Sequence, residues 1–128
     1  MREEQLSPQL GRLIDAAKAA LPAAGCARLE AEAVALLTEG GVIYTGCSIR
    51  DPSSGGCGAA VLALADHRAA GGGDIDAAAF ALGGPADSVS PCPECRRALA
   101  GIDPELPLAI RQRGRWVLVP LSAVPETS

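Results

Sequence analysis

The sequence predicts an α/β protein in which helices cover a mixed sheet. Three observations indicate this class. Apolar residues recur at helical spacing near the N-terminus, short apolar runs bounded by glycine follow them, and two further helical segments interrupt those runs. The resulting order of elements is α-β-β-α-β-α-β-β, which is typical of a sheet sandwiched between helices. The length of 128 residues and the 48% hydrophobic content fit one domain, spanning residues 1–128.

The first half of the chain predicts a helix followed by a hairpin. Over Gln9–Leu21 the apolar side chains fall on one helical face, and Pro22 ends the helix or lies just beyond it. Ala33–Leu37 and Val42–Thr45 are apolar runs on either side of a glycine pair, so we expect them to form a hairpin that turns at 38–41. The segments 1–8 and 125–128 are expected to be flexible.

The second half predicts two helices that each begin at a cysteine. The loop 51–56 leads into a helix over Cys57–Ala70, ended by three glycines and expected to be mostly buried through four apolar residues. These four residues are Val61, Leu62, Leu64 and Ala65. After a buried strand over Ile75–Leu82 and the loop 83–90, a second helix starts at the motif Pro91-Cys-Pro-Glu-Cys95 and runs to about Ala100. Two further strands are expected at 108–111 and 117–119, with Gly114 in the turn between them.

Charge and composition exclude several classes of partner. The net charge is −4, and no cluster of Lys and Arg is long enough to follow a phosphate backbone, so we expect no nucleic-acid substrate. The N-terminus lacks the pattern of a secretion signal, and no apolar stretch is long enough to span a membrane, which predicts a cytoplasmic protein without a membrane partner. In such a reducing compartment, five cysteines are better explained by metal binding and burial than by disulfides.

Three of these cysteines have the pattern of a zinc site. Cys57 lies at one predicted helix start, and Cys92 and Cys95 form a Cys-x-x-Cys pair at another. Helix N-termini help to keep such thiols ionised. Three protein ligands would leave a fourth position of Zn²⁺ open for water, as in catalytic rather than structural sites.

Two alternatives stay open for these cysteines. A structural zinc would need a fourth ligand, for which Cys26, Cys47 and His67 are the candidates. His67, however, is expected near the end of its helix, two turns or more from the metal, and we interpret it as a surface or helix-end residue. Alternatively, Cys92 and Cys95 are simply buried thiols, since an isolated Cys-x-x-Cys is a modest signal.

The spacing resembles the cytidine deaminase superfamily. Zinc deaminases combine a His/Cys-x-Glu helix start with a downstream Pro-Cys-x-x-Cys, and this chain has Cys57-Gly-Ala59 and Pro91-Cys-Pro-Glu-Cys95. The segments 35–46, 90–99 and 119–125 are also similar to the small cytidine deaminases and to blasticidin S deaminase. The resemblance implies a three-layer α-β-α fold with a five-stranded mixed sheet and assembly into a homotetramer or homodimer. It also implies that the Gly58 and Cys92 backbone amides lie near the reacting group.

The main departure from the family is at Ala59, where the resemblance implies a glutamate. In these enzymes that glutamate shuttles a proton while water activated by zinc replaces a ring amino group. An alanine methyl group cannot do this, so we expect the chain as written to lose roughly 10²- to 10⁴-fold in rate, the usual contribution of general acid-base catalysis. We favour an engineered glutamate-to-alanine change, because the three ligands are retained. The alternative is a natural pseudoenzyme that acts as a zinc-binding scaffold or ligand-binding module.

Departures from the family pattern place simple cytidine in doubt as the substrate, and we expect a modified nucleoside, a free aminopyrimidine or another amino-heterocycle at least as readily. Where cytidine deaminases carry an Asn and a Glu for the ribose, this chain has Ser48-Ile-Arg50-Asp51. Ser48 and Arg50 are therefore candidate substrate-binding residues. Arg50 could bind a carboxylate or phosphate, but the interpretation that we favour is a solvated surface arginine. We expect hydrolytic deamination of a cytosine-like nucleoside, a free base or a related amino-heterocycle.

Overall fold

A five-stranded mixed sheet forms the centre of the fold, with the strand order β2-β1-β3-β4-β5. The computed structural model describes residues 3–20, 30–50, 59–82, 93–112 and 115–124. The strands are β1 (Glu30–Thr38), β2 (Ile43–Arg50), β3 (Ile75–Leu82), β4 (Pro107–Gln112) and β5 (Arg115–Pro120). Only β3 and β4 run parallel within this sheet, and the other neighbouring strands are antiparallel. The predicted mixed sheet of five strands is confirmed.

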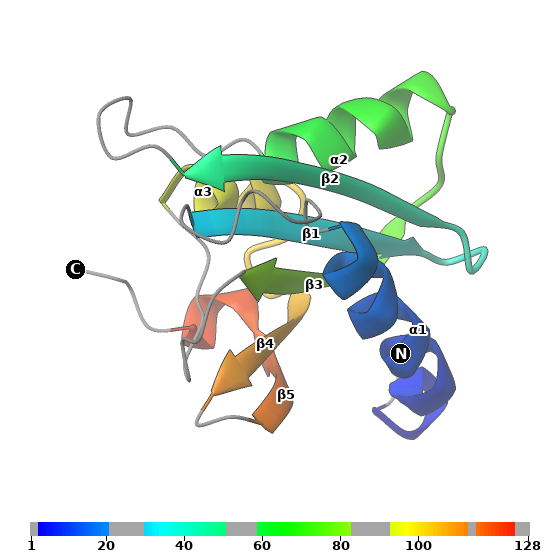
Figure 1. The fold of residues 1–128 in the computed structure, drawn as a ribbon. Coiled ribbons are helices and arrows are strands. Elements are labelled where there is room, and N and C mark those ends of the chain that lie inside the picture. Colours follow the sequence, from blue (N-terminus) through cyan, green and yellow to red (C-terminus); the bar gives the residue numbers. More distant parts are fainter. Residues whose placement is uncertain (1–2, 21–29, 51–58, 83–92, 113–114, 125–128) are drawn as a thin grey trace.

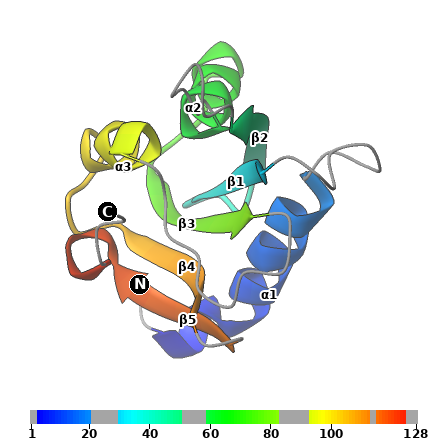
Figure 2. The same ribbon diagram turned by 60° about the vertical axis from the view of Figure 1, so that its left-hand side comes forward.

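Helices cover both faces of the sheet and complete three layers. Helix α1 (Glu3–Ala20) packs on one face, whereas α2 (Ala59–Ala69), α3 (Pro93–Ala100) and the short 3₁₀ helix η1 (Leu121–Ala123) lie on the other. Figure 2 shows α2 and α3 together on the side of the sheet opposite to α1. The parallel pair β3 and β4 is connected through α3, as a parallel connection requires a crossover. The predicted α-β-α arrangement is therefore confirmed.

The strands send side chains of different size to the two faces. Towards α2 and α3 they direct large residues, which form the larger part of the core: Val34, Leu36, Phe80, Leu108 and Ile110. Towards α1 the fully or almost fully buried strand residues are mainly alanine, together with one leucine: Ala35, Leu37, Ala77, Ala79, Ala81 and Ala109. Larger residues of the two edge strands pack partly buried against this cluster: Ile43, Trp116 and Leu118. This division follows from the alternation of side chains along a strand.

Helix α1 begins earlier than the sequence predicts. The expected start was Gln9, but the helix begins at Glu3 and continues through Pro8. The segment before Gln9 is mostly polar and has no apolar periodicity, and proline normally marks a helix start. The sequence pattern therefore did not indicate that residues 3–8 are helical. Leu13 and Ala17 are fully buried on the sheet, as expected from their spacing.

The hairpin between β1 and β2 is confirmed, and its strands are longer than predicted. Thr38 closes the turn twice: its amide donates to the carbonyl of Val42 at 3.0 Å, and its hydroxyl accepts from the Val42 amide at 3.2 Å. Gly41 has φ 84°, a conformation that favours glycine. Val42, expected in the strand, lies in this turn and is 50% exposed.

The prediction for the buried face of α2 is confirmed for Leu64 and wrong for the other three residues. Val61 and Leu62 are 45% and 51% exposed, and Ala65 is also exposed. The residues that α2 buries are Ala60, Ala63 and Leu64, at the i, i+3, i+4 spacing of one face. Because the helix is apolar on most sides, hydrophobic periodicity could not identify its buried face. The small alanines on that face allow the helix to approach the sheet closely. Gly71, with φ 68°, follows the end of the helix.

The other boundaries agree closely with the sequence. β3 occupies Ile75–Leu82 as predicted, and β4 and β5 extend the expected strands by a few residues. The predicted loops at 51–56 and 83–90 and the turn at Gly114 lie outside the described residues. The helix η1 was not predicted.

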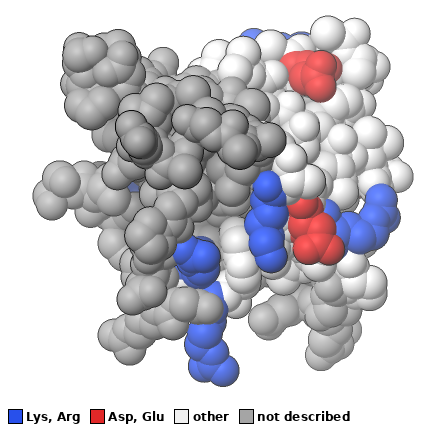
Figure 3. All heavy atoms as spheres, in the orientation of Figure 1, with Lys and Arg blue, Asp and Glu red and all other residues white. Residues whose placement is uncertain are grey.

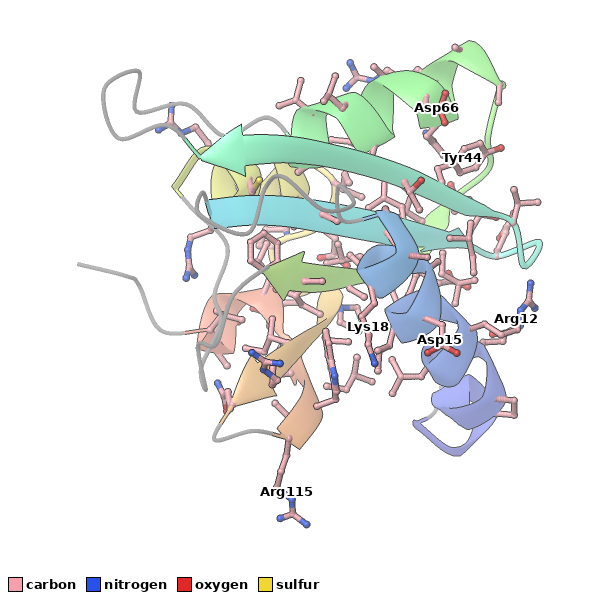
Figure 4. The ribbon with its side chains drawn as sticks, viewed as in Figure 1. Arg12, Asp15, Lys18, Tyr44, Asp66 and Arg115 are labelled. Carbon is pink, nitrogen blue, oxygen red and sulfur yellow. The ribbon has the colours of Figure 1, made fainter. Side chains whose placement is uncertain are left out.

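The described surface carries charges of both signs. On the face shown in Figure 3, basic and acidic side chains are interspersed. Figure 4 shows Asp15 between Arg12 and Lys18 along α1, and Arg115 at the start of β5. Among the described helices, none has both the length and the apolar character needed to cross a membrane.

Candidate functional site

The two predicted cysteine-bearing helix starts are found on the same face of the sheet. Helix α2 begins at Ala59, two residues after Cys57, and α3 begins at Pro93, directly after Cys92. α2 and α3 pack against each other, and in Figure 1 α3 lies near the end at which α2 begins. Cys57, Gly58 and Cys92 themselves lie outside the described residues.

Cys95 is the predicted zinc ligand whose side chain the structure describes. It is the third residue of α3 and is fully buried. It belongs to the same core cluster as Ala60 and Ala63 of α2, and as Leu99 one turn further along α3. Its thiol is therefore on the inner side of α3, in the layer formed by the two helices.

The sequence of α3 explains why Cys95 is directed inward. Cys95 and Leu99 are four residues apart and share the buried face of the helix, whereas Arg97 is exposed. Arg96 is half-buried, and one of its guanidinium nitrogens donates to the carbonyl of Val124 at 2.9 Å. This contact bridges 28 residues, and the sequence pattern gave no indication of it.

The donor chemistry at this position fits zinc as far as the structure describes it. A cysteine in the first turn of a helix offers a soft ligand and lies close to the positive end of the helix dipole. Within the described segments, no group of three or more His, Cys, Asp and Glu residues could hold a metal ion. The three-cysteine set predicted from the sequence includes two residues outside those segments, so it stays a prediction.

Ala59 is the first residue of α2, next to the buried Ala60. A residue at this position is held by the first turn of the helix, on the side of the molecule where α3 lies. Alanine has no group that accepts or donates a proton. The loss of the proton shuttle that the family resemblance implies for this position stays a prediction.

The candidate substrate residues Ser48 and Arg50 are at the C-terminal end of β2, away from the hairpin turn. In the antiparallel register with β1, Ser48 pairs with Glu32 and Arg50 pairs with Glu30. β2 is an edge strand and ends at Arg50. In Figure 1 the end of β2 lies near α3, and α2 begins at the end that is closer to α3. Their contact with a substrate remains a prediction.

The alternative fourth ligands are distributed differently. Cys26 lies outside the described residues, and Cys47 lies on β2 opposite Ala33. His67 is in the last turn of α2, and its Nε2 is 2.7 Å from the carbonyl oxygen of Gly73. The helix-end interpretation of His67 agrees with this placement.

Comparison with solved structures supports the superfamily that the sequence resembles. The cytidine deaminase from Burkholderia pseudomallei superposes with a TM-score of 0.70 at 28% identity, over 88% of this chain and 92% of the other. The chain belongs to the cytidine deaminase-like superfamily. The cytidine deaminase from Mycobacterium leprae gives a TM-score of 0.62 at 26% identity, with 85% and 92% of the two chains covered. That from Mycobacterium tuberculosis gives 0.58 at 25% identity, with 88% and 86% covered.

The resemblance to this superfamily lies in the fold more than in the overall sequence. No protein-family profile matches the chain, and no curated protein matches it by sequence. The structural match nevertheless extends over most of both chains, so the five strands and the helices on the two faces are shared as a set. The family resemblance and the fold class predicted from the sequence are both confirmed.

Proposed function

We propose that this chain has the site of a zinc-dependent hydrolytic deaminase, which removes an exocyclic amino group from a cytosine-like nucleoside, a base or a related amino-heterocycle. The observation that supports this most directly is the buried Cys95 in the first turn of α3, packed in the same cluster as the beginning of α2. In a chain with this fold, that is where the second cysteine of the Pro-Cys-x-x-Cys motif is expected.

The proposed site uses three cysteines and two backbone amides. Cys57, Cys92 and Cys95 would hold Zn²⁺ as thiolates, with one position left open. Zinc, when bound, supplies a Lewis acid that lowers the pKa of water towards neutrality. The amides of Gly58 and Cys92 would donate hydrogen bonds to the substrate and hold its ring in place.

Ala59 makes the chain as written inactive or nearly so in this proposal. The position at the start of α2 is suited to a general acid-base, but the methyl group cannot transfer a proton. We interpret Ala59 as an engineered replacement of glutamate. The second candidate, which the same residue favours, is a natural pseudoenzyme that binds zinc or a ligand without catalysis.

We propose a modified nucleoside, a free aminopyrimidine or another amino-heterocycle as substrate at least as readily as simple cytidine. Ser48 and Arg50 stand near the end of β2 where the ribose-binding Asn and Glu are expected from the family resemblance. Arginine binds carboxylate and phosphate groups more readily than a neutral sugar, so we propose a modified or acidic amino-heterocycle. We also propose a cytoplasmic protein that assembles as a homotetramer or homodimer.

Restoring a carboxylate at position 59 tests the proposal. Ala59→Glu should bind about one zinc ion per chain and release ammonia from at least one member of a panel containing cytosine, cytidine and blasticidin S. Ala65→Glu is the matched control, because Ala65 lies on the exposed side of the same helix and adds the same charge away from the site. Cys95→Ser in the Ala59→Glu background should lose both zinc and activity.

The outcomes separate the two candidate functions. Zinc binding without ammonia release from any substrate in Ala59→Glu would favour the zinc-binding scaffold. Protein that carries well under one zinc ion per chain would contradict both candidates. Activity in Ala65→Glu equal to that in Ala59→Glu would show that the added carboxylate does not act at the start of α2.

A further inference from the structure

Helix α3 is too short to hold its own position. It has eight residues, and isolated helices of this length are not stable in water, so its orientation depends on contacts with the rest of the chain. Its C-terminal end continues through a tight turn, in which the amides of Gly101, Ile102 and Asp103 donate to carbonyls of the helix. The N-terminal half, which includes Cys95, needs a separate attachment.

Arg96 connects this half of α3 to the C-terminal turn, which consists of η1 and Val124. Its guanidinium donates to the carbonyl of Val124 at 2.9 Å, and Val124 is only 4% exposed. The neighbouring Arg97 has the same chemistry but is exposed on the outer side of the helix. Of these two adjacent arginines, Arg96 is therefore the one directed towards a distant part of the chain.

The C-terminal turn is itself fixed to the sheet, so the contact made by Arg96 is with a rigid support. The Leu121 amide donates to the Leu106 carbonyl at 2.8 Å, directly before β4. The Val124 amide donates to the Leu121 carbonyl at 3.1 Å, which closes the turn. The Ser122 hydroxyl donates to a carboxylate oxygen of Glu105 at 2.7 Å.

Hydrophobic packing also connects α3 with the C-terminal turn. Leu121 and Val124 are buried in the core cluster that contains Cys95 and Leu99. Arg96 thus lies beside Cys95 in sequence and is hydrogen-bonded to a turn that packs in the same cluster as the Cys95 side chain. A change in the position of α3 would break the Arg96 contact and alter this packing together.

We propose that Arg96 is a positioning residue for the Cys95 thiol, which it holds in place for zinc by fixing the first turn of α3 to the carbonyl of Val124. This inference rests on the proposed function, because it needs a metal at Cys95. Residues that orient metal ligands through a second layer of contacts typically change metal affinity by about 10- to 100-fold when they are replaced. We expect an effect in this range from Arg96 and none from Arg97.

The test compares Arg96→Met with Arg97→Met in the protein as written, so that catalysis is not needed. Methionine keeps most of the side-chain length but removes the charge and all N–H donors. Zinc affinity is measured by competition with a chromogenic chelator, at a temperature well below the unfolding midpoint of each variant. Arg96→Met should weaken zinc binding about 10-fold or more relative to the parent protein. Arg97→Met should leave it within about twofold, the range expected of an exposed side chain.

Hydrogen exchange of the zinc-free protein supplies a second readout. Arg96→Met should increase exchange of the amides in α3 and of the Val124 amide, whereas β1 and β3 should exchange as in the parent. If Arg96→Met does not fold, Arg96→Lys replaces it and is compared with Arg97→Lys. Lysine keeps the charge but has a different donor geometry from the guanidinium, so Arg96→Lys should still weaken zinc binding more than Arg97→Lys does.

Each result has a distinct meaning. Equal zinc affinity in the Arg96 and Arg97 variants, with zinc bound normally by the parent, would overturn the positioning role and leave the proposed function intact. Absence of zinc from the parent protein would overturn the proposed function, and the inference with it. Weaker binding in Arg96→Met with unchanged exchange in α3 would also overturn the role, because the effect would then not act through the position of the helix.

Discussion

The Nε2 atom of His67 lies 2.7 Å from the carbonyl oxygen of Gly73, at the point where the chain leaves α2 and enters β3. The same imidazole ring meets the ring of Tyr44 on β2 edge to face, with the centroids 5.3 Å apart and an interplanar angle of 87°. Figure 4 shows Tyr44 directed from β2 towards α2. His67 therefore connects the end of α2 to β2 and to the segment that leads into β3.

Gly72→Ala should destabilise the protein through His67. A Cβ atom at this position would lie 2.7 Å from the imidazole Nε2 and closer still to Cδ2, so the ring would have to move away from Gly73. We expect the free energy of unfolding to fall by about 1–3 kcal/mol, the usual cost of overpacking. Chemical denaturation measures this change.

Gly11→Ala is the control for that prediction. Gly11 is inside α1, and a Cβ there has no atom within 4 Å. Because alanine favours helix, this substitution should raise the free energy of unfolding by about 0.5–1 kcal/mol. Equal destabilisation by both substitutions would contradict the role of the His67 contact.

The contact between Tyr44 and His67 should be measurable as a coupling. Aromatic pairs in this geometry contribute about 0.5–1.5 kcal/mol beyond their buried area. A double-mutant cycle with Tyr44→Leu and His67→Ala should give a coupling energy in that range. A second cycle, which pairs Tyr44→Leu with Arg12→Ala, should give a value near zero, because Arg12 is on α1, which covers the face of the sheet opposite to α2. Additive effects in the first cycle would rule out the pair as a stabilising unit.

Phe80→Ala should be among the most destabilising single substitutions. Phe80 is fully buried on β3, at the centre of the cluster beneath α2 and α3. Removing its ring should cost about 3–5 kcal/mol, because the surrounding large side chains collapse only in part. Leu62→Ala, at a residue that is 51% exposed, should change stability by less than about 0.5 kcal/mol. Thermal unfolding of the two variants checks both values, and a large effect of Leu62→Ala in the isolated chain would contradict the exposed placement.

Ala79→Leu should destabilise the other side of the sheet. Ala79 is fully buried on β3 beneath α1, where the neighbouring residues of the sheet are mostly alanine. Three added carbon atoms have no space there, so we expect a loss of about 1–3 kcal/mol. Ala65→Leu adds the same atoms to the exposed side of α2 and should be nearly neutral. If denaturation gave the two variants equal stability, the close packing of α1 would be refuted.

Removal of zinc should lower the unfolding temperature, if the proposed function is correct. A metal that binds the folded chain adds its binding free energy to stability, and a chelator removes that contribution. In Cys95→Ser, which lacks a proposed ligand, the chelator should have little further effect. An equal shift in the parent protein and in Cys95→Ser would show that the metal binds elsewhere.

The sequence was sufficient for most of the sheet and for the order of elements. β3 is bounded by glycine and matches its predicted range, and the hairpin follows from the pair Gly40-Gly41 between two apolar runs. The inward direction of Cys95 is consistent with its spacing from Leu99 on one helix face. These features depend on local patterns, which a single sequence contains.

Other features depend on contacts between distant residues and could not be predicted. The buried side of α2 is set by the small residues that allow it to approach β1 and β2, and an evenly apolar helix gives no periodicity to identify it. Arg96 and Arg97 are adjacent residues of the same type, so the sequence does not distinguish them. Only the tertiary structure shows that Arg96 reaches Val124. The position of η1 likewise depends on the hydrogen bonds to residues 105 and 106.

The buried side chains on the two faces of the sheet differ in size, so the two faces tolerate amino-acid substitutions to different extents. At the centre of the face under α1, where β1, β3 and β4 contribute buried alanines, added bulk would push against the helix and carry the cost of overpacking. On the opposite face, large aliphatic and aromatic groups can be exchanged for others of similar volume at modest cost. We therefore expect substitutions that change specificity to be tolerated more readily beneath α2 and α3. The small residues beneath α1 should tolerate fewer changes.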